Sequence, residues 1–386
     1  MEIGKSKTTC GLSDFEIELK NRILIIASEF PPGPGGIGHH AWFLAKELSK
    51  LEHVTVDVIC PKDFTTDEEA NRFDTESSFE IHRFERVKGF TQILRLIKLI
   101  KLLLSNRYSH FWSTGKFALW MIWLQRIFSR CSKTLCILHG SEVNLNNSIL
   151  RKLTHFSINK FQTIVSVSNF TQGLLPERIL KHHSNLKVIP NGLDKSDFLL
   201  QNNKNLKGSP ALLTVGHVSP RKGQHRLIKA LHELIKKYPN VHYHMVGRPV
   251  NQGVLESLAS ELNVREYITF HGSVKDHSDL WDYYAAADLF ILLSENQSNG
   301  DVEGFGIVAL EANACGTPVL GAKGCGVEEA VSHLNSGYLV DGDNVADILQ
   351  GVEFCVENKT SLSSTSVNWA NEHNWSNIIE QFKACV

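Results

Sequence analysis

Short runs of apolar residues alternate with amphipathic stretches along most of the chain. In the first half, the apolar runs are RILIIA (Arg22–Ala27), VTVDVIC, FEIHRF, SHFWS, TLCILHG and TIVSVS. Runs of this length predict buried strands, and apolar residues three and four positions apart predict helices. The first run is followed by a Gly-rich loop and by the helical pattern HAWFLAKELSKL. A strand, a Gly-rich loop and a helix in succession are typical of the opening of a doubly wound α/β domain.

The same alternation begins again in the second half. The apolar runs are ALLTVG, VHYHMVG, YITFHGSV, LFILLS and TPVLGA, and the helical patterns between them include HRLIKALHELIKKYP, LESLASELNV and DLWDYYAAAD. Strands that alternate with helices predict a second parallel sheet. Between the halves, Lys195–Pro210 is polar and punctuated by Gly and Pro, as linkers are.

The chain therefore predicts two Rossmann-like, doubly wound parallel-sheet domains that face each other across a cleft. Its 386 residues exceed what one ordinary hydrophobic core organises. We expect a tail over 1–20, a first domain over 21–203, a second domain over 204–366 and a terminal helix over 367–386.

The composition of the chain argues against several classes of protein. The eight cysteines form no C-x-x-C pairs, so neither a zinc ribbon nor a disulfide framework is expected, and scattered thiols fit a reducing cytoplasm. No His/Cys/Asp cluster has the spacing of metal ligands, so no metal site is predicted. We also expect no signal peptide and no transmembrane helix. A net charge of −1 does not suggest binding to nucleic acid.

Charge is nevertheless distributed unevenly. From Arg86 to Ser141 there are ten basic residues and no acidic one. Within this stretch, Arg95, Lys98 and Lys101 step by three and predict one polar stripe on an otherwise apolar helix. Basic residues with aromatics on an apolar helix favour contact with an anionic membrane. The candidate contact residues are Arg95, Lys98, Lys101, Trp120 and Trp123. The alternative is a pair of ordinary helices that cover the first sheet.

Two glutamates mark the most informative segment, VEGFGIVALEANACGTPV. Glu303 adjoins a Gly-Phe-Gly turn, and Glu311 falls within the helical pattern that begins at Ile307. The start of a helix presents free backbone N–H groups and the positive end of its dipole, which favours an anion. The segment can therefore hold a phosphorylated, hydroxyl-rich ligand, although a capped core helix remains the alternative.

Further candidates follow other predicted strands, where parallel sheets bind ligands. Arg221 and Lys222 lie in HVSPRKGQH and could neutralise a diphosphate, with a solvated turn as the alternative. His139 ends the run TLCILHG and could face a sugar, although a lone histidine is usually structural. Gly36 belongs to the first Gly-rich loop, where glycines permit close approach to a phosphate.

Taken in order, these motifs resemble the retaining glycosyltransferases of family 4, which have the GT-B fold. The resemblance runs from about Arg22 to the C-terminal helix and rests on FPPGPGGIGHH, HGSE, VSVSNFT, VIPNGLD, TVGHVSPRKGQH and EGFGIVALEANACGTPV. It implies a nucleotide-sugar donor held mainly by the second domain and an acceptor held mainly by the first. It also implies a final helix that crosses back to the first domain.

The resemblance further implies a role for each candidate residue. Glu303 would bind hydroxyls of the transferred sugar, and Glu311 would bind the donor ribose. Arg221 and Lys222 would hold the diphosphate without a metal or cofactor, and His139 would lie near the reactive face of the sugar. Backbone N–H groups that would also hold the diphosphate belong to Gly36, Phe305, Gly306 and Ile307.

Donor and acceptor are less closely defined. The lead-in SENQSNGDVEGFG is longer than the commonest family form and looks like that of some mannosyltransferases acting on lipids. This favours GDP-mannose over a UDP-hexose. We expect transfer to a lipid-linked or other surface glycan in polysaccharide or lipopolysaccharide biosynthesis, in the cytoplasm at the inner membrane face. The alternatives are a sugar-nucleotide epimerase of the same fold and a non-catalytic nucleotide-sugar-binding protein.

Overall fold

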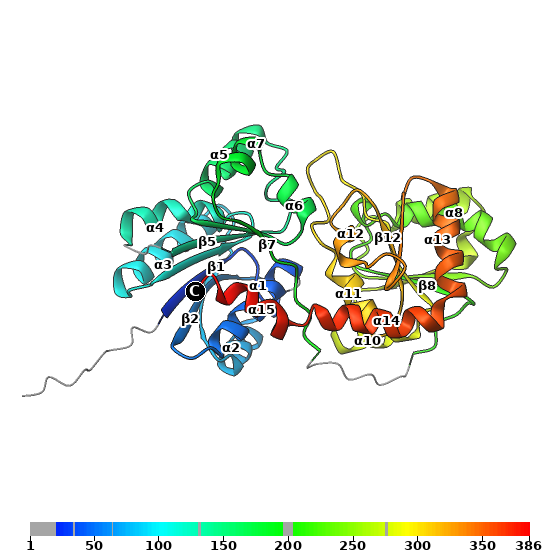
Figure 1. Cartoon of the computed structure of the whole chain (residues 1–386), viewed down its shortest axis with the longest axis horizontal. Helices are drawn as coiled ribbons and strands as arrows, with labels where there is room; N and C mark the ends of the chain where they lie inside the picture. Colours follow the sequence, from blue (N-terminus) through cyan, green and yellow to red (C-terminus); the bar gives the residue numbers. More distant parts are fainter. Residues whose placement is uncertain (1–20, 34, 64, 130–132, 196–203, 275–276) are drawn as a thin grey trace, which may run out of the picture.

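Two parallel sheets organise the chain, one toward each end of its long axis (Figure 1). The computed structural model describes residues 21–386 except 34, 64, 130–132, 196–203 and 275–276, so the expected tail and the centre of the expected linker lie outside the described residues. The first sheet has the strand order β3-β2-β1-β4-β5-β6-β7, and the second has the order β10-β9-β8-β11-β12-β13. Two doubly wound α/β units are thus confirmed.

The strands of the first sheet are β1 (Asn21–Ala27), β2 (Val54–Lys62), β3 (Glu80–Glu85), β4 (His110–Thr114), β5 (Lys133–Leu138), β6 (Thr163–Ser166) and β7 (Leu186–Val188). Those of the second are β8 (Ala211–Val215), β9 (His242–Val246), β10 (Ile268–Gly272), β11 (Leu289–Leu292), β12 (Val319–Ala322) and β13 (Gly337–Val340). The central strands β4, β8 and β11 are buried along their whole length. Burial on both faces explains why they appear in the sequence as continuous apolar runs.

Helices cover both faces of each sheet. The first unit contains α1 (Gly36–Ser49), α2 (Asp67–Glu76), α3 (Thr91–Ser105), η1 (Leu119–Met121), α4 (Ile122–Phe128), α5 (Ser148–Ile158), α6 (Asn169–Gly173) and α7 (Glu177–His182). The second contains η2 (Pro220–Lys222), α8 (Gln224–Lys237), α9 (Gln252–Glu261), η3 (Arg265–Tyr267), α10 (His277–Ala286), α11 (Ile307–Ala314), α12 (Val327–Ala330), α13 (Val345–Glu357) and α14 (Lys359–Glu372), and the last helix of the chain is α15 (Trp375–Lys383).

The end of the chain passes from the second unit to the first (Figure 1). Helix α14 packs on α11, and α15 packs on α1, where the rings of Trp375 and Phe43 stack with centroids 6.0 Å apart. The two helices are separate because Asn374 caps α15 by accepting a hydrogen bond from Ser376 N. At this crossing, Leu193 N donates to His373 O at 2.8 Å.

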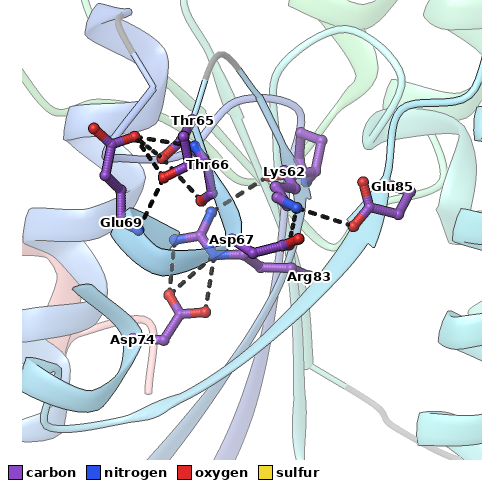
Figure 2. A network of polar contacts seen from close by, with 9 residues as sticks. Lys62, Thr65, Thr66, Asp67, Glu69, Asp74, Arg83 and Glu85 are labelled. Atoms are coloured by element: carbon purple, nitrogen blue, oxygen red, sulfur yellow. Dashed lines mark hydrogen bonds and ion pairs between the residues drawn. The ribbon is translucent and has the colours of Figure 1, made fainter. Parts of the chain in front are cut away.

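Polar contacts join the end of β2, α2 and β3 (Figure 2), and Arg83 extends them to the loop after β1. Thr66 and Glu69 form a capping box that starts α2. The guanidinium of Arg83, on β3, holds Asp74 of α2 at 2.7 Å and donates to the carbonyl of Pro31 at 2.6 Å. A paired, forked cation therefore anchors one end of the Gly-rich loop.

Helix α3 corrects one expectation. Arg95 is only 2 % exposed, and its guanidinium lies 4.9 Å from the ring centroid of Phe84. Lys98 is half-buried and donates to the carbonyl of Arg83 at 3.0 Å, whereas Lys101 is exposed. The expected polar stripe is therefore wrong, because Arg95 lies on the face that packs on the sheet. The outward face is instead largely apolar and includes Ile93, Ile97 and Leu104.

Candidate active site

Two cations and one carboxylate meet where strands β8 and β11 end. Arg221 and Lys222 belong to η2, directly after β8, and Glu303 lies in the loop between β11 and α11. The Nζ atom of Lys222 is 2.7 Å from Oε2 of Glu303, and Arg221 forms an ion pair with the same oxygen. Burial alone would raise the pKa of Glu303, but the charges of Lys222 and Arg221 outweigh it and lower the pKa to about 2. The side chain, 12 % exposed, is therefore held as a carboxylate at neutral pH.

A glycine fixes the cationic turn in place. Gly223 follows Lys222 with φ of 70° and is the N-cap residue of α8. A Cβ at this position would overlap the carbonyl of Leu293, the residue after β11. The close approach of these two backbones brings the cations to the Glu303 loop, and only glycine permits it without strain.

The site straddles both units. Asp301 lies 3.2 Å from Arg221 and accepts a hydrogen bond at 2.8 Å from Ser141, which belongs to the first unit. The carbonyl of Gly304 accepts hydrogen bonds from Ser168 at 2.5 Å and from Thr171 at 3.1 Å. The loop that carries Glu303 is thus hydrogen-bonded to the opposite unit on both sides of that residue.

His139 is brought to this seam by the end of β5. Its carbonyl lies against Gly304, where a Cβ would overlap it. Its ring Nε2 lies 2.8 Å from Oγ1 of Thr114, and burial lowers its pKa to about 3, so the imidazole is neutral at physiological pH. The ring also meets that of His40 edge to face at 5.0 Å.

A cavity of about 520 Å³ lies between the two units and adjoins the start of α11. Gly36, Ile307 and Glu311 line it, together with Trp281 and other residues of both units. Tyr284 donates to Oε2 of Glu311 at 2.6 Å, which orients this carboxylate. The volume falls in the range typical of small-molecule sites. The predicted site residues Gly36, Ile307 and Glu311, which are far apart in the sequence, therefore line the same cavity.

The helix start next to this cavity has the expected turn. Gly306 has φ of 88°, and α11 begins at Ile307. The first N–H groups of a helix lack intrahelical partners. Phe305 is buried, and of the three predicted residues Phe305, Gly306 and Ile307 only Ile307 lines the cavity.

Sequence reasoning missed the contact that closes the seam. Glu329, on α12, accepts hydrogen bonds from the backbone N–H groups of Asn169 at 2.8 Å and Phe170 at 3.0 Å, and from the Asn169 side chain at 2.8 Å. These residues lie 160 positions apart, so the contact exists only once both units are packed together. The one local signal was a Ser-Asn pair after β6, which is typical of a helix cap.

The predicted membrane tryptophans lie away from this site. Trp120 donates from its ring nitrogen to Thr154 of α5, and Trp123 donates to Ser157, each at 3.0 Å. Both rings are half-buried and attach η1 and α4 to α5. In the described part of the chain, none of the helices is both long and apolar enough to cross a membrane. Within the same residues, no three His, Cys, Asp or Glu side chains converge as a metal site would require.

Comparison with known families covers most of the chain. Residues 34–197 match the family model described as Glycosyltransferase Family 4. Residues 196–373 match the model described as Glycosyl transferases group 1. The two matches adjoin one another at the connection between the two sheets.

Individual relatives agree with these matches. The GDP-mannose-dependent alpha-(1-6)-phosphatidylinositol monomannoside mannosyltransferase of Mycolicibacterium smegmatis is 26 % identical over 371 residues, which cover 92 % of this chain and 94 % of the relative. The D-inositol 3-phosphate glycosyltransferase of Geodermatophilus obscurus is 32 % identical over 183 residues, which cover 45 % of this chain and 39 % of that protein.

Solved structures share the fold. The Anabaena protein HepE in complex with UDP aligns with a TM-score of 0.72 at 21 % identity, covering 94 % of this chain and 98 % of that one. A glycosyltransferase from Rickettsia africae aligns with a TM-score of 0.74 at 18 % identity, covering 95 % and 97 % of the two chains. At such identities the likeness shows the fold alone, and it confirms the GT-B arrangement of the two sheets.

Proposed function

The chain belongs to the glycosyltransferases of family 4, and from that premise we propose that it transfers mannose from GDP-mannose to a lipid-linked glycan acceptor. The observation that carries this proposal is the cluster of Arg221, Lys222 and Glu303 beside the cavity that contains Glu311. The mannosyltransferase relatives, which match nearly the whole chain, support this choice of donor and acceptor class.

Each part of the donor has a matching group. The carboxylate of Glu311, oriented by Tyr284, suits the two hydroxyls of a ribose inside the cavity. Arg221 and Lys222 supply the positive charge that a diphosphate requires, with the start of α11 beside them. Glu303 is ionised and can therefore accept hydrogen bonds from hydroxyls of the transferred sugar.

Donor binding exchanges one anion for another. Without donor, Glu303 forms ion pairs with both cations, and Asp301 also pairs with Arg221. The diphosphate takes over part of that role, which frees carboxylate lone pairs for the sugar hydroxyls. The cations are thus pre-positioned rather than recruited, which lowers the cost of reorganisation during the reaction.

The chemistry we propose retains the anomeric configuration and needs no metal. The bond between the anomeric carbon and the diphosphate oxygen breaks, and a bond from the acceptor hydroxyl oxygen forms on the same face. The hydroxyl proton passes to the departing diphosphate oxygen. Negative charge grows on the diphosphate, where Arg221 and Lys222 stabilise it. His139, whose carbonyl adjoins Gly304 next to Glu303, is assigned to the side of the sugar where positive charge develops.

We place the enzyme at an anionic membrane through the outer face of α3, α4 and α5. Trp123 of α4 stacks on Phe156 of α5 at 5.1 Å, so the helices form one continuous layer. Exposed apolar side chains of this layer, here named the α3–α5 face, are Ile93, Ile97, Leu104, Ile127, Phe128, Ile149, Leu150, Leu153 and Phe156. Exposed Lys101, Arg126 and Lys152 accompany them, and cations beside apolar side chains favour anionic lipid.

A donor screen tests the proposal. Thermal unfolding is measured with UDP-, GDP-, ADP- and TDP-sugars, since a ligand raises the midpoint as the logarithm of its concentration over Kd. We expect GDP-mannose to stabilise the protein, and expect Lys222→Ala to abolish the shift while Lys229→Ala, an exposed lysine on α8, preserves it. Stabilisation by no nucleotide sugar would refute the proposed function. The anomeric configuration of the product, read by NMR, then tests retention.

A further inference from the structure

A second cavity, of about 380 Å³, has both Ser141 and Asp301 in its wall and shares no lining residue with the 520 Å³ cavity proposed for the donor, here named the nucleotide cavity. Segments 116–120 and 141–150 of the first unit line it, and the loop 299–301 of the second unit closes it. That loop belongs to the polar lead-in before Glu303, whose length distinguishes this chain from the commonest family form. The proposed donor chemistry uses neither the cavity nor the lead-in.

The lining combines flat apolar surface with polar groups. The rings of Phe117 and Trp120 meet edge to face with centroids 5.3 Å apart, and the bond from Trp120 to Thr154 fixes their position. Asn146 and Asn299 are exposed and line the same space. Rings offer faces to the C–H groups of a cyclic polyol, and amides offer donors and acceptors to its hydroxyls.

One cation completes the lining. Lys116 is exposed and forms no ion pair within 4 Å among the described residues, although its charge acts to lower the pKa of the buried Glu142. The nearby acids are engaged elsewhere: Asp301 pairs with Arg221, and the buried Glu142 accepts a hydrogen bond from His139 N. An exposed ammonium beside amides and rings suits a phosphate attached to a polyol.

The cavity is connected to the reaction centre by a chain of three contacts. Ser141, in its wall, binds Asp301, Asp301 pairs with Arg221, and Arg221 pairs with Glu303. Gly300, with φ of 86°, presses the tip of the lead-in onto the carbonyl of Asn144, which a Cβ would overlap. Contact between the two units therefore forms the cavity wall next to the transferred sugar.

Its other border is the α3–α5 face. Leu150 lines the cavity and is 39 % exposed, and its neighbour Ile149 is 75 % exposed. A molecule with a polar head and an apolar tail can thus place the head in the cavity and the tail along α5.

We propose that this cavity binds the head group of the acceptor, a cyclic polyol that carries a phosphate, with Lys116 on the phosphate and Asn146 and Asn299 on the hydroxyls. The inference rests on the proposed transfer function and adds the position and chemistry of the acceptor. The lead-in then acts as the wall that selects the acceptor rather than as part of the donor site.

Binding of two probes tests this assignment. The enzyme saturated with GDP is titrated with soluble inositol 1-phosphate, and separately with phosphatidylcholine vesicles that do or do not contain phosphatidylinositol. We compare wild type, the double variant Lys116→Ala/Asn299→Ala, and Lys152→Ala, which changes an exposed lysine of α5 outside the cavity. We expect the double variant to weaken binding at least tenfold and Lys152→Ala to leave the affinity for the soluble probe within twofold of wild type.

The outcomes separate the possibilities. Binding of the soluble probe alone identifies a free polyol phosphate as the ligand, and binding that also requires phosphatidylinositol in vesicles identifies the lipid. Failure of both probes, or equal binding by the double variant and wild type, overturns the assignment. The thermal shift with GDP-mannose is measured on the same proteins. A preserved shift with an unaffected acceptor affinity refutes this inference alone, whereas a missing shift in wild type refutes the transfer function itself.

Discussion

The ammonium of Lys222 lies 2.7 Å from the carboxylate of Glu303, so the cation proposed for the diphosphate already holds an anion of the protein itself. The pair is nearly buried, with side chains 9 % and 12 % exposed. A carboxylate in this position competes with the diphosphate leaving group for the positive charge of Lys222.

Glu303→Gln is expected to separate binding from transfer. Removing the negative charge releases Lys222 and leaves Arg221 paired only with Asp301, so GDP should bind more tightly by calorimetry. Transfer should fall about 10- to 100-fold or more, because hydrogen bonds from hydroxyls to a charged acceptor contribute roughly 1.5–3 kcal/mol. Glu261→Gln, at an exposed position of α9, is the matched control. Weaker GDP binding in Glu303→Gln would contradict the proposed exchange of anions.

The same pair predicts how stability depends on acid. The pKa of Glu303 is about 2 in the folded protein and 4.5 for an ordinary glutamate. A lowered folded-state pKa contributes stability above pH 4.5, and this contribution is lost as the pH falls toward 2. The contribution is on the order of 3 kcal/mol. Urea unfolding at a series of pH values should show a steeper acid loss in wild type than in Glu303→Gln, and equal slopes would show that the pair does not control acid stability.

The cationic turn depends on its glycine. Gly223→Ala forces a side chain into a left-handed conformation and against the carbonyl of Leu293, and a strained residue of this kind costs about 1–3 kcal/mol. We expect a lower unfolding midpoint and weakened GDP affinity, because Lys222 moves with the turn. Gly253→Ala, in α9 with open space around the added Cβ, should be neutral or stabilising by about 0.5–1 kcal/mol. A Gly223→Ala protein with wild-type affinity would separate the turn from donor binding.

Vesicle binding should depend on apolar side chains of α3 rather than on Arg95. Replacing Ile93, Ile97 and Leu104 by Gln removes exposed apolar area, where each buried CH₂ is worth about 0.8 kcal/mol, so sedimentation with anionic vesicles should fall at least tenfold. The control is Val250→Gln/Val254→Gln, at exposed apolar positions of the second unit. Arg95→Gln should instead lower thermal stability, because this guanidinium is buried over aromatic rings. Unchanged sedimentation of the triple variant would rule out the α3–α5 face as the membrane contact.

Glu329 is expected to act by holding the two units together. Glu329→Ala removes three acceptor contacts to Asn169 and Phe170 without touching the nucleotide cavity. Donor affinity should stay within twofold of wild type, while kcat falls and small-angle scattering shows a larger radius of gyration. Glu261→Ala is the control. A normal kcat would mean that Ser168 and Thr171, through Gly304, are sufficient to close the seam.

The sequence predicted most of the sheets because their central strands are buried on both faces. The short strand β13, Gly337–Val340, was missed, since four residues with a glycine and partly exposed neighbours give no clear apolar run. A terminal helix was expected over 367–386, but the break that divides this stretch between α14 and α15 was missed, although Asn374 is a typical cap residue. In both places the local pattern is short, and tertiary packing decides the structure.

Site residues that follow strands of one parallel sheet could be predicted from the sequence. Contacts that depend on packing between the two units could not. Arg221 and Glu303 lie 82 residues apart, yet both follow strands whose carboxyl ends meet. The links Ser141–Asp301 and Glu329–Asn169 depend on how the units approach each other, which no local pattern encodes. Arg95 was misplaced because its burial requires Phe84, a ring on another element.

The chain passes between the two units twice, and the passages meet where Leu193 N donates to His373 O and accepts from Trp375 N through its own carbonyl. Because the two chain connections are hydrogen-bonded side by side, we expect the units to rotate about one line and to resist sliding or twisting apart. Glu303 and His139 belong to different units, so we expect a rotation at these connections to change the distance between the two residues at the reaction centre.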